Sequence, residues 1–257
     1  MAATISSAQL LGALQCAPDD APLLIDVRRT AAFRAAGDFI PGALRREPET
    51  VAQWAPALSA LQSVVVYCVH GHEVSQGVAQ ALCEQGIECR YLEHGIEGWR
   101  AAGGTFDSKR AGASTAWITR ERPKIDRIAC PWLIRRFIDA DAEFHYVPAA
   151  EVMQAAVARG AIPFDVQGVQ FGHHESRCSF DAFIEAYRLR EAALSRLALI
   201  VRAADTGQPE AAPEAAGLLA ISQGLSRIYT DDHAMLGHGM VMYDALYAAC
   251  GGRSLAA

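Results

Sequence analysis

The sequence predicts an α/β domain built on a parallel sheet, followed by a mostly α-helical α+β domain. Three observations lead to this fold class. The chain has 257 residues, which suits two domains of roughly 100 to 150 residues each. Its 51% hydrophobic and 20% charged residues are typical of a globular protein that buries a sizeable core. Short apolar runs alternate with helical patterns in the first half, whereas helical patterns dominate the second half.

Compact apolar runs in the first half are the predicted strands. They are LLIDV at 23–27, VVVYC at 64–68 and CRYLE at 89–93, and helix-like stretches separate them. This alternation is typical of a parallel sheet with crossover helices. The stretch 101–114 is rich in Gly, Ala and Ser and has no apolar period, which indicates a linker. We therefore predict domains over 1–107 and 115–257, joined by a linker at 108–114.

The second half begins with two short predicted strands and continues with helices. WITR at 117–120 and EFHYV at 143–147 are the strands, and 168–174 is a further extended piece. Ser179 is the expected N-cap of one helix, and Thr230 or Asp231 caps the last one. The predicted helices cover 126–138, 180–187, 191–205, 213–225 and 230–250.

Charge, cysteine content and the first residues exclude several classes of protein. The net charge of −6 argues against general nucleic-acid binding, although residues 109–136 form a basic segment. Seven irregularly spaced cysteines without a CxxC pair indicate reduced thiols rather than a disulfide framework. The first twenty residues lack a signal-peptide pattern, and no run of about 18 apolar residues follows. We therefore expect a cytoplasmic protein without a membrane partner.

A cysteine stands at the end of a predicted strand and before a predicted helix. In VVVYCVHGHEVSQG the strand ends at Cys68, a six-residue loop follows, and Ser75 opens the helix. Backbone N–H groups and a helix N-terminus around such a thiol favour the thiolate, which is the reactive form. Gly71 permits the tight bend, and His70 and His72 can add hydrogen bonds near neutral pH. The pattern predicts a reactive Cys68, with a buried structural cysteine as the alternative.

Over roughly residues 5–106 the first half resembles the rhodanese family. The matching segments, in the family's order and spacing, are LLIDVR at 23–28, FIPGAL at 39–44, the loop that opens with Cys68, and YLEHGIEGWRAAGG at 91–104. The resemblance implies that Cys68 accepts sulfane sulfur as a transient persulfide, with Asp26 and Arg28 supporting the loop. It also implies a substrate-binding cradle formed by Val69, His70, Gly71, His72, Glu73 and Val74.

This loop contains no arginine and offers Glu73 instead. A small dianion such as thiosulfate therefore has no obvious charge partner in the loop. We expect a small-molecule sulfur donor other than thiosulfate, and a thiol or another soft nucleophile as the acceptor.

The basic segment in the second half contains RERPKIDRIACPWLIRRF at 120–137. If it is helical, Arg127, Arg135 and Arg136 can converge on an oxyanion such as chromate, or they can form ion pairs within the domain. We expect Cys130, next to Pro131, to be packed, and the alternative is that the neighbouring arginines lower the pKa of its thiol.

Over about residues 115–250 the second half resembles the chromate-resistance proteins of the ChrB type. The matching segments are RPKIDRIACPWLIRRFID at 122–139, IPFDV at 162–166, HHESRCSFD at 173–181, APEAAGLLAISQGLS at 212–226, DDHAML at 231–236 and YDALYAAC at 243–250. The resemblance implies a role in oxyanion or metal stress. Some members of this family regulate transcription in response to chromate, but a rhodanese-like module occupies the region before the ChrB-type domain in this chain.

Histidines and carboxylates of the second half also suggest a metal site. His173, His174 and Glu175 lie on a predicted loop, Asp205 ends a helix, and Asp232 and His233 begin another. Imidazole and carboxylate ligands together suit Zn, Mn, Fe or Ni. The predicted ligands of such a divalent metal are His173, Asp205, Asp232 and His233.

Three hypotheses about function follow. In the first, the protein is a cytoplasmic sulfurtransferase that carries sulfur on Cys68, joined to a chromate-resistance domain that binds an oxyanion or a metal. In the second, it is a chromate-responsive sensor or transcriptional regulator, which would bind DNA in a salt-dependent way. In the third, it is a metal-dependent enzyme whose chemistry lies wholly in the second half.

Overall fold

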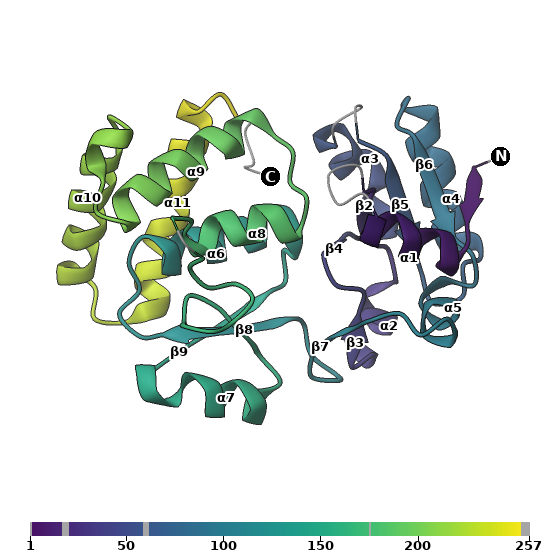
Figure 1. The fold of residues 1–257 in the computed structure, drawn as a ribbon, viewed down its shortest axis with the longest axis horizontal. Helices are drawn as coiled ribbons and strands as arrows, with labels where there is room; N and C mark the ends of the chain where they lie inside the picture. Colours follow the sequence, from purple (N-terminus) through teal and green to yellow (C-terminus); the bar gives the residue numbers. More distant parts are fainter. Residues whose placement is uncertain (1, 17–20, 59–61, 175, 253–257) are drawn as a thin grey trace. The chain divides into compact units, whose positions relative to one another are not determined.

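The structure is a computed structural model that describes residues 2–16, 21–58, 62–174 and 176–252 (Figure 1). The chain divides into two compact units, Met1–Ser114 and Thr115–Ala257, called unit 1 and unit 2 below. None of the helices in these described ranges combines the length and the apolar character that a membrane crossing requires.

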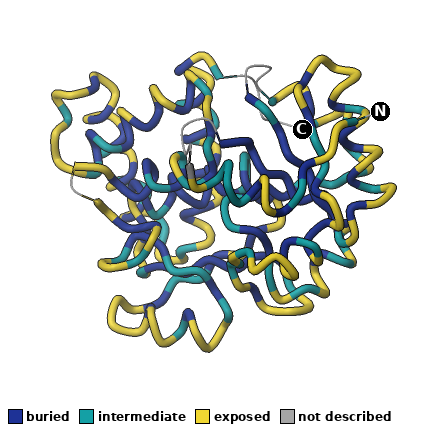
Figure 2. Tube along the Cα trace, turned by 45° about the vertical axis from the view of Figure 1, so that its right-hand side comes forward, coloured by how far each residue is buried: buried dark blue, intermediate teal, exposed yellow. Residues whose placement is uncertain are grey.

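Unit 1 is built on a five-stranded sheet in which every neighbouring pair is parallel, as predicted. The strand order is β1-β6-β5-β2-β4. The strands are β1 (Ala3–Ile5), β2 (Leu23–Asp26), β4 (Ala43–Arg45), β5 (Val64–Tyr67) and β6 (Cys89–Leu92). The apolar runs predicted β2, β5 and β6, whereas β1 and β4 are too short to give a pattern of their own. All four residues of the central strand β5 are buried, which suits its β-branched sequence. Figure 2 colours buried segments dark blue and exposed segments yellow, and the exposed segments lie mostly at the periphery.

Helices connect the strands of unit 1 and cover the sheet. They are α1 (Ser7–Cys16), α2 (Thr30–Ala35), α3 (Val51–Trp54), α4 (Glu73–Glu84) and α5 (Gly95–Ala101). The core joins the sheet to these helices: Leu10 of α1 and Trp99 of α5 cluster with Val65 and Tyr67 of β5. The carboxyl end of β5 is therefore held in a rigid layer, and the segment that leaves it starts from a fixed position.

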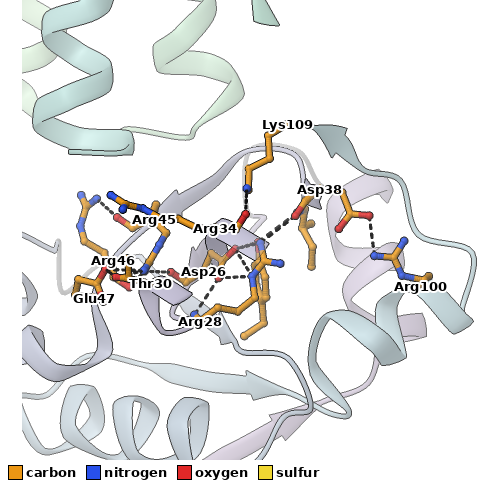
Figure 3. Close-up of polar contacts among 12 residues, drawn as sticks. Asp26, Arg28, Thr30, Arg34, Asp38, Arg45, Arg46, Glu47, Arg100 and Lys109 are labelled. Carbon is orange, nitrogen blue, oxygen red and sulfur yellow. Dashed lines mark hydrogen bonds and ion pairs between the residues drawn. The ribbon is translucent and has the colours of Figure 1, made fainter. Parts of the chain in front are cut away.

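The segment predicted as a linker is tied to unit 1. Its strand β7 (Asp107–Ser108) pairs antiparallel with β3 (Asp38–Phe39). The buried Lys109 donates from Nζ to the Arg34 carbonyl at 3.1 Å (Figure 3). It also donates to the Ala113 carbonyl at 2.8 Å. Hydrogen bonds therefore join residues 107–113 to unit 1, although only Lys109 of this segment is buried.

Unit 2 combines a small parallel sheet with six helices in the part of it that is described. The sheet has the order β10-β8-β9, with β8 (Ala116–Arg120), β9 (Glu143–Val147) and β10 (Ile162–Pro163). The helices are α6 (Asp126–Leu133), α7 (Val152–Arg159), α8 (Ser179–Ala186), α9 (Ala192–Asp205), α10 (Ala215–Ile228) and α11 (Asp232–Ala249). Helix α7 packs on β8, and α6 packs on α8 and α11 (Figure 1). The predicted helix-rich α+β character is confirmed.

Three local predictions in unit 2 have different outcomes. Asp231 is the N-cap of α11, and its carboxylate accepts from the Ala234 N–H at 2.7 Å, as one of the two predicted caps. Ser179 is not a cap: Cys178 occupies that position, and the Asp181 carboxylate accepts from its N–H at 3.1 Å. The predicted helix over 126–138 is α6 followed by a π-helical turn, Ile134–Ile138.

Candidate functional site

Cys68 lies at the point where β5 ends and the chain turns toward α4. The residue is 6% exposed, and its Sγ lies 3.2 Å from Oγ of Ser75. Helix α4 begins at Glu73, two residues before the predicted start at Ser75. The difference has a physical reason: the Ser75 hydroxyl does not cap the helix but bonds the His72 carbonyl, at 3.3 Å, and the thiol. The first turn of α4 is therefore directly beside the sulfur.

A close approach of two glycines fixes the shape of the loop. Gly71 has φ +72°, and a Cβ placed there would lie 2.6 to 2.8 Å from backbone atoms of residues 92–95. Gly95 faces it with φ +56°, and a Cβ there would lie 2.4 Å from the Cys68 carbonyl oxygen. Helix α5 then donates to the loop, from Ile96 N–H to the Cys68 carbonyl at 3.0 Å. Only glycine fits both positions, so the bend after Cys68 depends on them.

The loop amides are the remaining part of this site. The loop's carbonyls accept hydrogen bonds from α5, but none of the N–H groups of residues 69–74 donates to an acceptor within the described ranges. His70 turns toward Glu97, with Nδ1 3.0 Å from Oε2, and both side chains are exposed. The predicted cradle residues Val69 to Val74 thus surround the turn with unused donors, and Glu73 opens α4. Such a set of N–H groups at a helix N-terminus stabilises negative charge.

Asp26, the last residue of β2, forms an ion pair with Arg28 (Figure 3). The two side chains are each 2% exposed and pair at 2.6 Å, and Arg28 also donates to the Asp38 carbonyl at 3.0 Å. The Tyr67 hydroxyl donates to the Asp26 carboxylate at 3.0 Å and accepts from the Ile40 N–H at 3.2 Å. Because Tyr67 precedes Cys68, this buried network fixes where the loop begins.

The two other described cysteines of unit 1 near the sheet have different environments. Cys83 is exposed on α4, whereas Cys89 is buried in β6. The Cys83 thiol donates to the Cys89 carbonyl at 3.5 Å. Burial, together with the neighbouring Cys83, raises the pKa of Cys89 to about 12. Cys89 therefore stays a thiol at neutral pH, and Cys83 is the accessible one.

Unit 2 contains a second site, where carboxylates gather around His173. Its Nε2 lies 3.1 Å from Oδ2 of Asp205, 3.2 Å from Oδ1 of Asp165 and 3.5 Å from Oδ2 of Asp126. Asp126 opens α6 and Asp205 ends α9, so the fold joins segments that are distant in the sequence. Ligand atoms of Asp126, His173 and Asp205 all lie within 4.8 Å of one another. We call these three residues the Asp–His–Asp cluster.

Burial and mutual repulsion shift the pKa values in this cluster. Burial, followed by the neighbouring Asp126 and Asp165, raises the pKa of Asp205 to about 7. A hydrogen bond to Asp126 is the main cause that raises the pKa of His173 to about 9. Asp126 itself is 0% exposed, and burial raises its pKa. Its Oδ2 accepts from the Ser179 N–H at 2.6 Å, whereas its buried Oδ1 has no hydrogen-bond partner among the described residues.

The predicted metal ligands are therefore only partly together. His173 and Asp205 lie in the cluster, but Asp232 and His233 do not belong to it. The Asp232 carboxylate accepts from the Arg122 N–H at 3.2 Å, and the His233 ring packs on Tyr146 with centroids 5.5 Å apart. Asp232 and His233, at the start of α11, thus have other contacts, and the prediction that they are ligands of the same metal is wrong. Glu175 lies outside the described residues.

The three arginines of the basic segment, for which a shared oxyanion and ion pairs within the domain were the alternatives, have separate partners. Arg127 Nε lies 3.3 Å from the Asp165 carboxylate, and Arg136 pairs with Asp244 at 2.6 Å. Arg135 donates to the Ala142 carbonyl at 3.3 Å and lies over the Phe144 ring. The three side chains thus contact different groups of unit 2, which agrees with the alternative of contacts within the domain rather than one shared anion.

Cys130 is packed, as expected, and is 0% exposed. Burial, and the Asp126 carboxylate after it, raise its pKa well above the ordinary value. The arginines that are its neighbours in the sequence therefore do not activate this sulfur, because their side chains pair elsewhere.

Two carboxylates of the second site were not among the predicted ligands. Asp126 and Asp165 stand in IDRIAC and IPFDV, segments in which most residues are apolar. Carboxylates in such runs are rarely buried unless they are paired, and this signal could have marked them. Asp165 is paired with Arg120 at 2.8 Å and accepts from the Ser179 hydroxyl at 3.2 Å.

Comparisons with known proteins agree with the division into two units. Residues 7–102 match the family model of the rhodanese-like domain, and residues 117–250 match that of the ChrB C-terminal domain. Protein ChrB of Cupriavidus metallidurans is 36% identical over 132 residues, which are 51% of this chain and 39% of that protein. The chain thus spans well under half the length of this curated relative.

Solved structures of rhodanese-type proteins resemble part of the chain. A rhodanese-related protein from Thermoplasma volcanium matches 40% of this chain and 96% of its own, with 20% identity and a TM-score of 0.36. A rhodanese-like domain protein from Staphylococcus aureus matches 38% of this chain and 90% of its own, with 21% identity and a TM-score of 0.34. The family assignment rests on the two family models: the chain belongs to the ChrB family through its C-terminal domain and carries a rhodanese-like domain before it.

Proposed function

We propose that unit 1 is a sulfurtransferase that carries sulfane sulfur on Cys68 as a persulfide, and that this chemistry serves chromate resistance together with the ChrB domain of unit 2. One observation carries the proposal: Cys68 faces the first turn of α4 beside loop amides that have no acceptor among the described residues. Such donors stabilise the thiolate before transfer and the terminal sulfur after it.

The transfer needs two displacements at sulfur. The Cys68 thiolate attacks the sulfane sulfur of a donor R–S–SH, the donor's S–S bond breaks, and RS⁻ leaves with the electron pair as Cys68–S–SH forms. An acceptor thiolate then attacks the outer sulfur, forms its own persulfide, and Cys68 leaves as the thiolate. No net oxidation or reduction occurs, so the cycle needs no further redox partner.

Ser75 has a supporting part in this cycle. Its Oγ lies 3.2 Å from the Cys68 sulfur, and it is buried within the first turn of α4. When Cys68 is a thiolate, the hydroxyl can turn its proton from the His72 carbonyl toward the sulfur. A hydrogen bond to the charged form favours that form.

The charges around the loop favour a donor of low charge. The loop has no arginine, His70 is paired with Glu97, and Glu73 adds a carboxylate at the start of α4. A dianion such as thiosulfate meets this carboxylate without a guanidinium to compensate it. A low-molecular-weight persulfide, which carries less negative charge at its sulfane sulfur, suits the site better.

Sulfur loading of the full-length protein tests the proposal. The protein is incubated with glutathione persulfide or with thiosulfate, desalted and treated with cyanide, and the thiocyanate released is measured. We expect about one sulfur per chain on the wild type and on Cys83→Ala, which removes the exposed cysteine of the same unit, and none on Cys68→Ala. Intact mass should show an adduct of about 32 Da that reductant removes. Equal loading of Cys68→Ala and the wild type would overturn the proposal.

A further inference from the structure

All residues of the second site belong to unit 2. We propose that Asp126, His173 and Asp205 bind one divalent first-row transition-metal ion, through one imidazole nitrogen and two carboxylate oxygens. The proposal stands on the geometry of the cluster, on an unpartnered buried oxygen, and on the charge that the cluster has available for a cation.

The geometry is that of donor atoms arranged around a small ion. The His173 Nε2 lies 3.1 Å from the Asp205 carboxylate and 3.5 Å from the Asp126 carboxylate. Donors bound to one ion at about 2.1 Å, at angles near a right angle or somewhat wider, lie roughly 3.0 to 3.5 Å from one another. A single imidazole N–H can satisfy only one acceptor well, whereas a cation satisfies all the oxygens that face it.

The unpartnered oxygen is Oδ1 of Asp126. This residue is 0% exposed, and Oδ1 has no hydrogen-bond partner within the described ranges. The other oxygen, Oδ2, is held by the Ser179 N–H at 2.6 Å and faces His173. A fully buried carboxylate that lacks one of its partners is costly, and a bound cation is the ordinary way to compensate it.

Charge compensation points to a doubly charged ion. Asp165 also approaches His173, but its carboxylate is already paired with Arg120 at 2.8 Å and Arg127 at 3.3 Å. Among the described residues, Asp126 and Asp205 then have no arginine as an ion-pair partner. With a neutral His173 they balance a charge of 2+.

The donor types narrow the choice of ion. One imidazole and two carboxylates suit Mn²⁺, Fe²⁺ and Zn²⁺ better than Ca²⁺ or Mg²⁺, which prefer oxygen alone. The thiols of Cys130 and Cys178 are near the cluster, but burial raises the pKa of each well above its ordinary value. Both therefore stay protonated and line the site without supplying a thiolate.

The cluster is open on one side. The side chain of Asp126 is 1% exposed, that of Asp205 19%, and that of His173 43%. The buried carboxylate forms the floor, and the imidazole lies at the entrance. An ion bound there keeps coordination positions for water or for a small anion, in contrast to a closed structural site.

Manganese binding to the full chain tests the proposal. The metal-free, untagged protein is titrated with Mn²⁺, free Mn²⁺ is followed by electron paramagnetic resonance, and nitrogen coupling to bound Mn²⁺ is measured by pulsed methods. The tested variants are His173→Ala and Asp205→Asn, both at partly exposed positions. The matched controls are His174→Ala, whose ring bonds the Gln170 carbonyl, and Asp232→Asn, a carboxylate outside the cluster. Circular dichroism verifies that each variant is folded.

We expect one Mn²⁺ per chain on the wild type and on both controls, with nitrogen coupling. Each cluster variant should lose affinity by at least about 100-fold, and His173→Ala should lose the coupling. Cys68→Ala should bind as the wild type does, which separates this proposal from the sulfurtransferase proposal. No stoichiometric binding by the wild type would overturn it, and so would wild-type affinity in folded His173→Ala or Asp205→Asn.

Discussion

The contact between Gly71 and the start of α5 should make Gly71→Ala far more damaging than an ordinary loop substitution. An alanine Cβ would lie 2.6 Å from the Leu92 carbonyl oxygen, 2.7 Å from the His94 nitrogen and 2.8 Å from the Gly95 nitrogen. All three are backbone atoms, so no side-chain rotation relieves the contact. The loop must move away from α5, and the Cys68 thiol moves with it.

The free energy of unfolding should fall through two separate effects. The left-handed backbone, with φ +72°, costs an alanine roughly 1 to 2 kcal/mol. Forcing the extra methyl group against packed backbone adds about 1 to 3 kcal/mol. The total expected loss is therefore about 2 to 5 kcal/mol. Gly86→Ala is the matched control, because Gly86 has φ +79° and nothing lies within 4 Å of its added Cβ.

Thiol labelling in urea measures this loss unit by unit. Cys89 of β6 is 3% exposed and Cys130 of α6 is 0% exposed, so their alkylation, quantified peptide by peptide, reports the unfolding of unit 1 and unit 2 separately. We expect Gly71→Ala to destabilise the Cys89 peptide by about 1 to 3 kcal/mol more than Gly86→Ala does. The Cys130 peptide should not change, and sulfur loading of Cys68 should fall at least tenfold.

Equal destabilisation by Gly71→Ala and Gly86→Ala would refute the reasoning. It would mean that only the backbone conformation matters and that the loop does not press on α5. Full sulfur loading in a destabilised Gly71→Ala would mean that loading of Cys68 does not depend on the bend of the loop, and would contradict the role proposed for the loop.

Three further predictions concern other parts of the molecule. Asp26→Asn leaves the buried Arg28 guanidinium without its counter-charge and should destabilise unit 1 by about 3 to 5 kcal/mol, measured by the same urea labelling, whereas a loss under about 1 kcal/mol would contradict a dry ion pair. The melting temperature of unit 2, measured in chelator, should fall as the pH rises from 6 to 9. The pKa of Asp205 is raised to about 7 and that of His173 to about 9, so the folded state binds more protons than the unfolded state in this range. Saturating Mn²⁺ should flatten this pH dependence, and a melting temperature in chelator that rises with pH would contradict the direction of these pKa shifts. Because the arginines of the 120–136 segment hold partners within unit 2, a fluorescent DNA duplex at about 150 mM salt should bind with a Kd weaker than about 100 µM, and a tighter, salt-dependent affinity would favour the regulator hypothesis.

Local patterns in the sequence predicted much of unit 1. The β-branched run before Cys68 is β5, and the alternation of strands and helices corresponds to a parallel sheet. The helix after the loop starts earlier than predicted because Ser75 bonds the sulfur and a loop carbonyl rather than the helix end. The hydrogen bonds of Ser75 depend on its contact with Cys68 across the loop, and capping preferences of single residues do not predict such a contact.

The contacts of the charged residues in unit 2 were harder to predict from the sequence than its helices. Its helices follow from apolar periodicity, yet the partners of its charged residues do not. Arg127, Arg135 and Arg136 are neighbours in the sequence but end on three different partners. Neighbouring residues of a helix point in different directions, so each side chain meets a different element of the fold and finds its partner there.

The sequence by itself determined the two-part organisation, the family of each part, and Cys68 as the candidate sulfur carrier, because those features are written in short segments read along the chain. Only the tertiary structure decided that Asp126 joins His173 and Asp205 while Asp232 and His233 remain outside the group. The physical reason is that these side chains come from the start of α6, a loop and the end of α9. The packing of separate helices sets the distances among these side chains, and the spacing of residues along the sequence does not predict that packing.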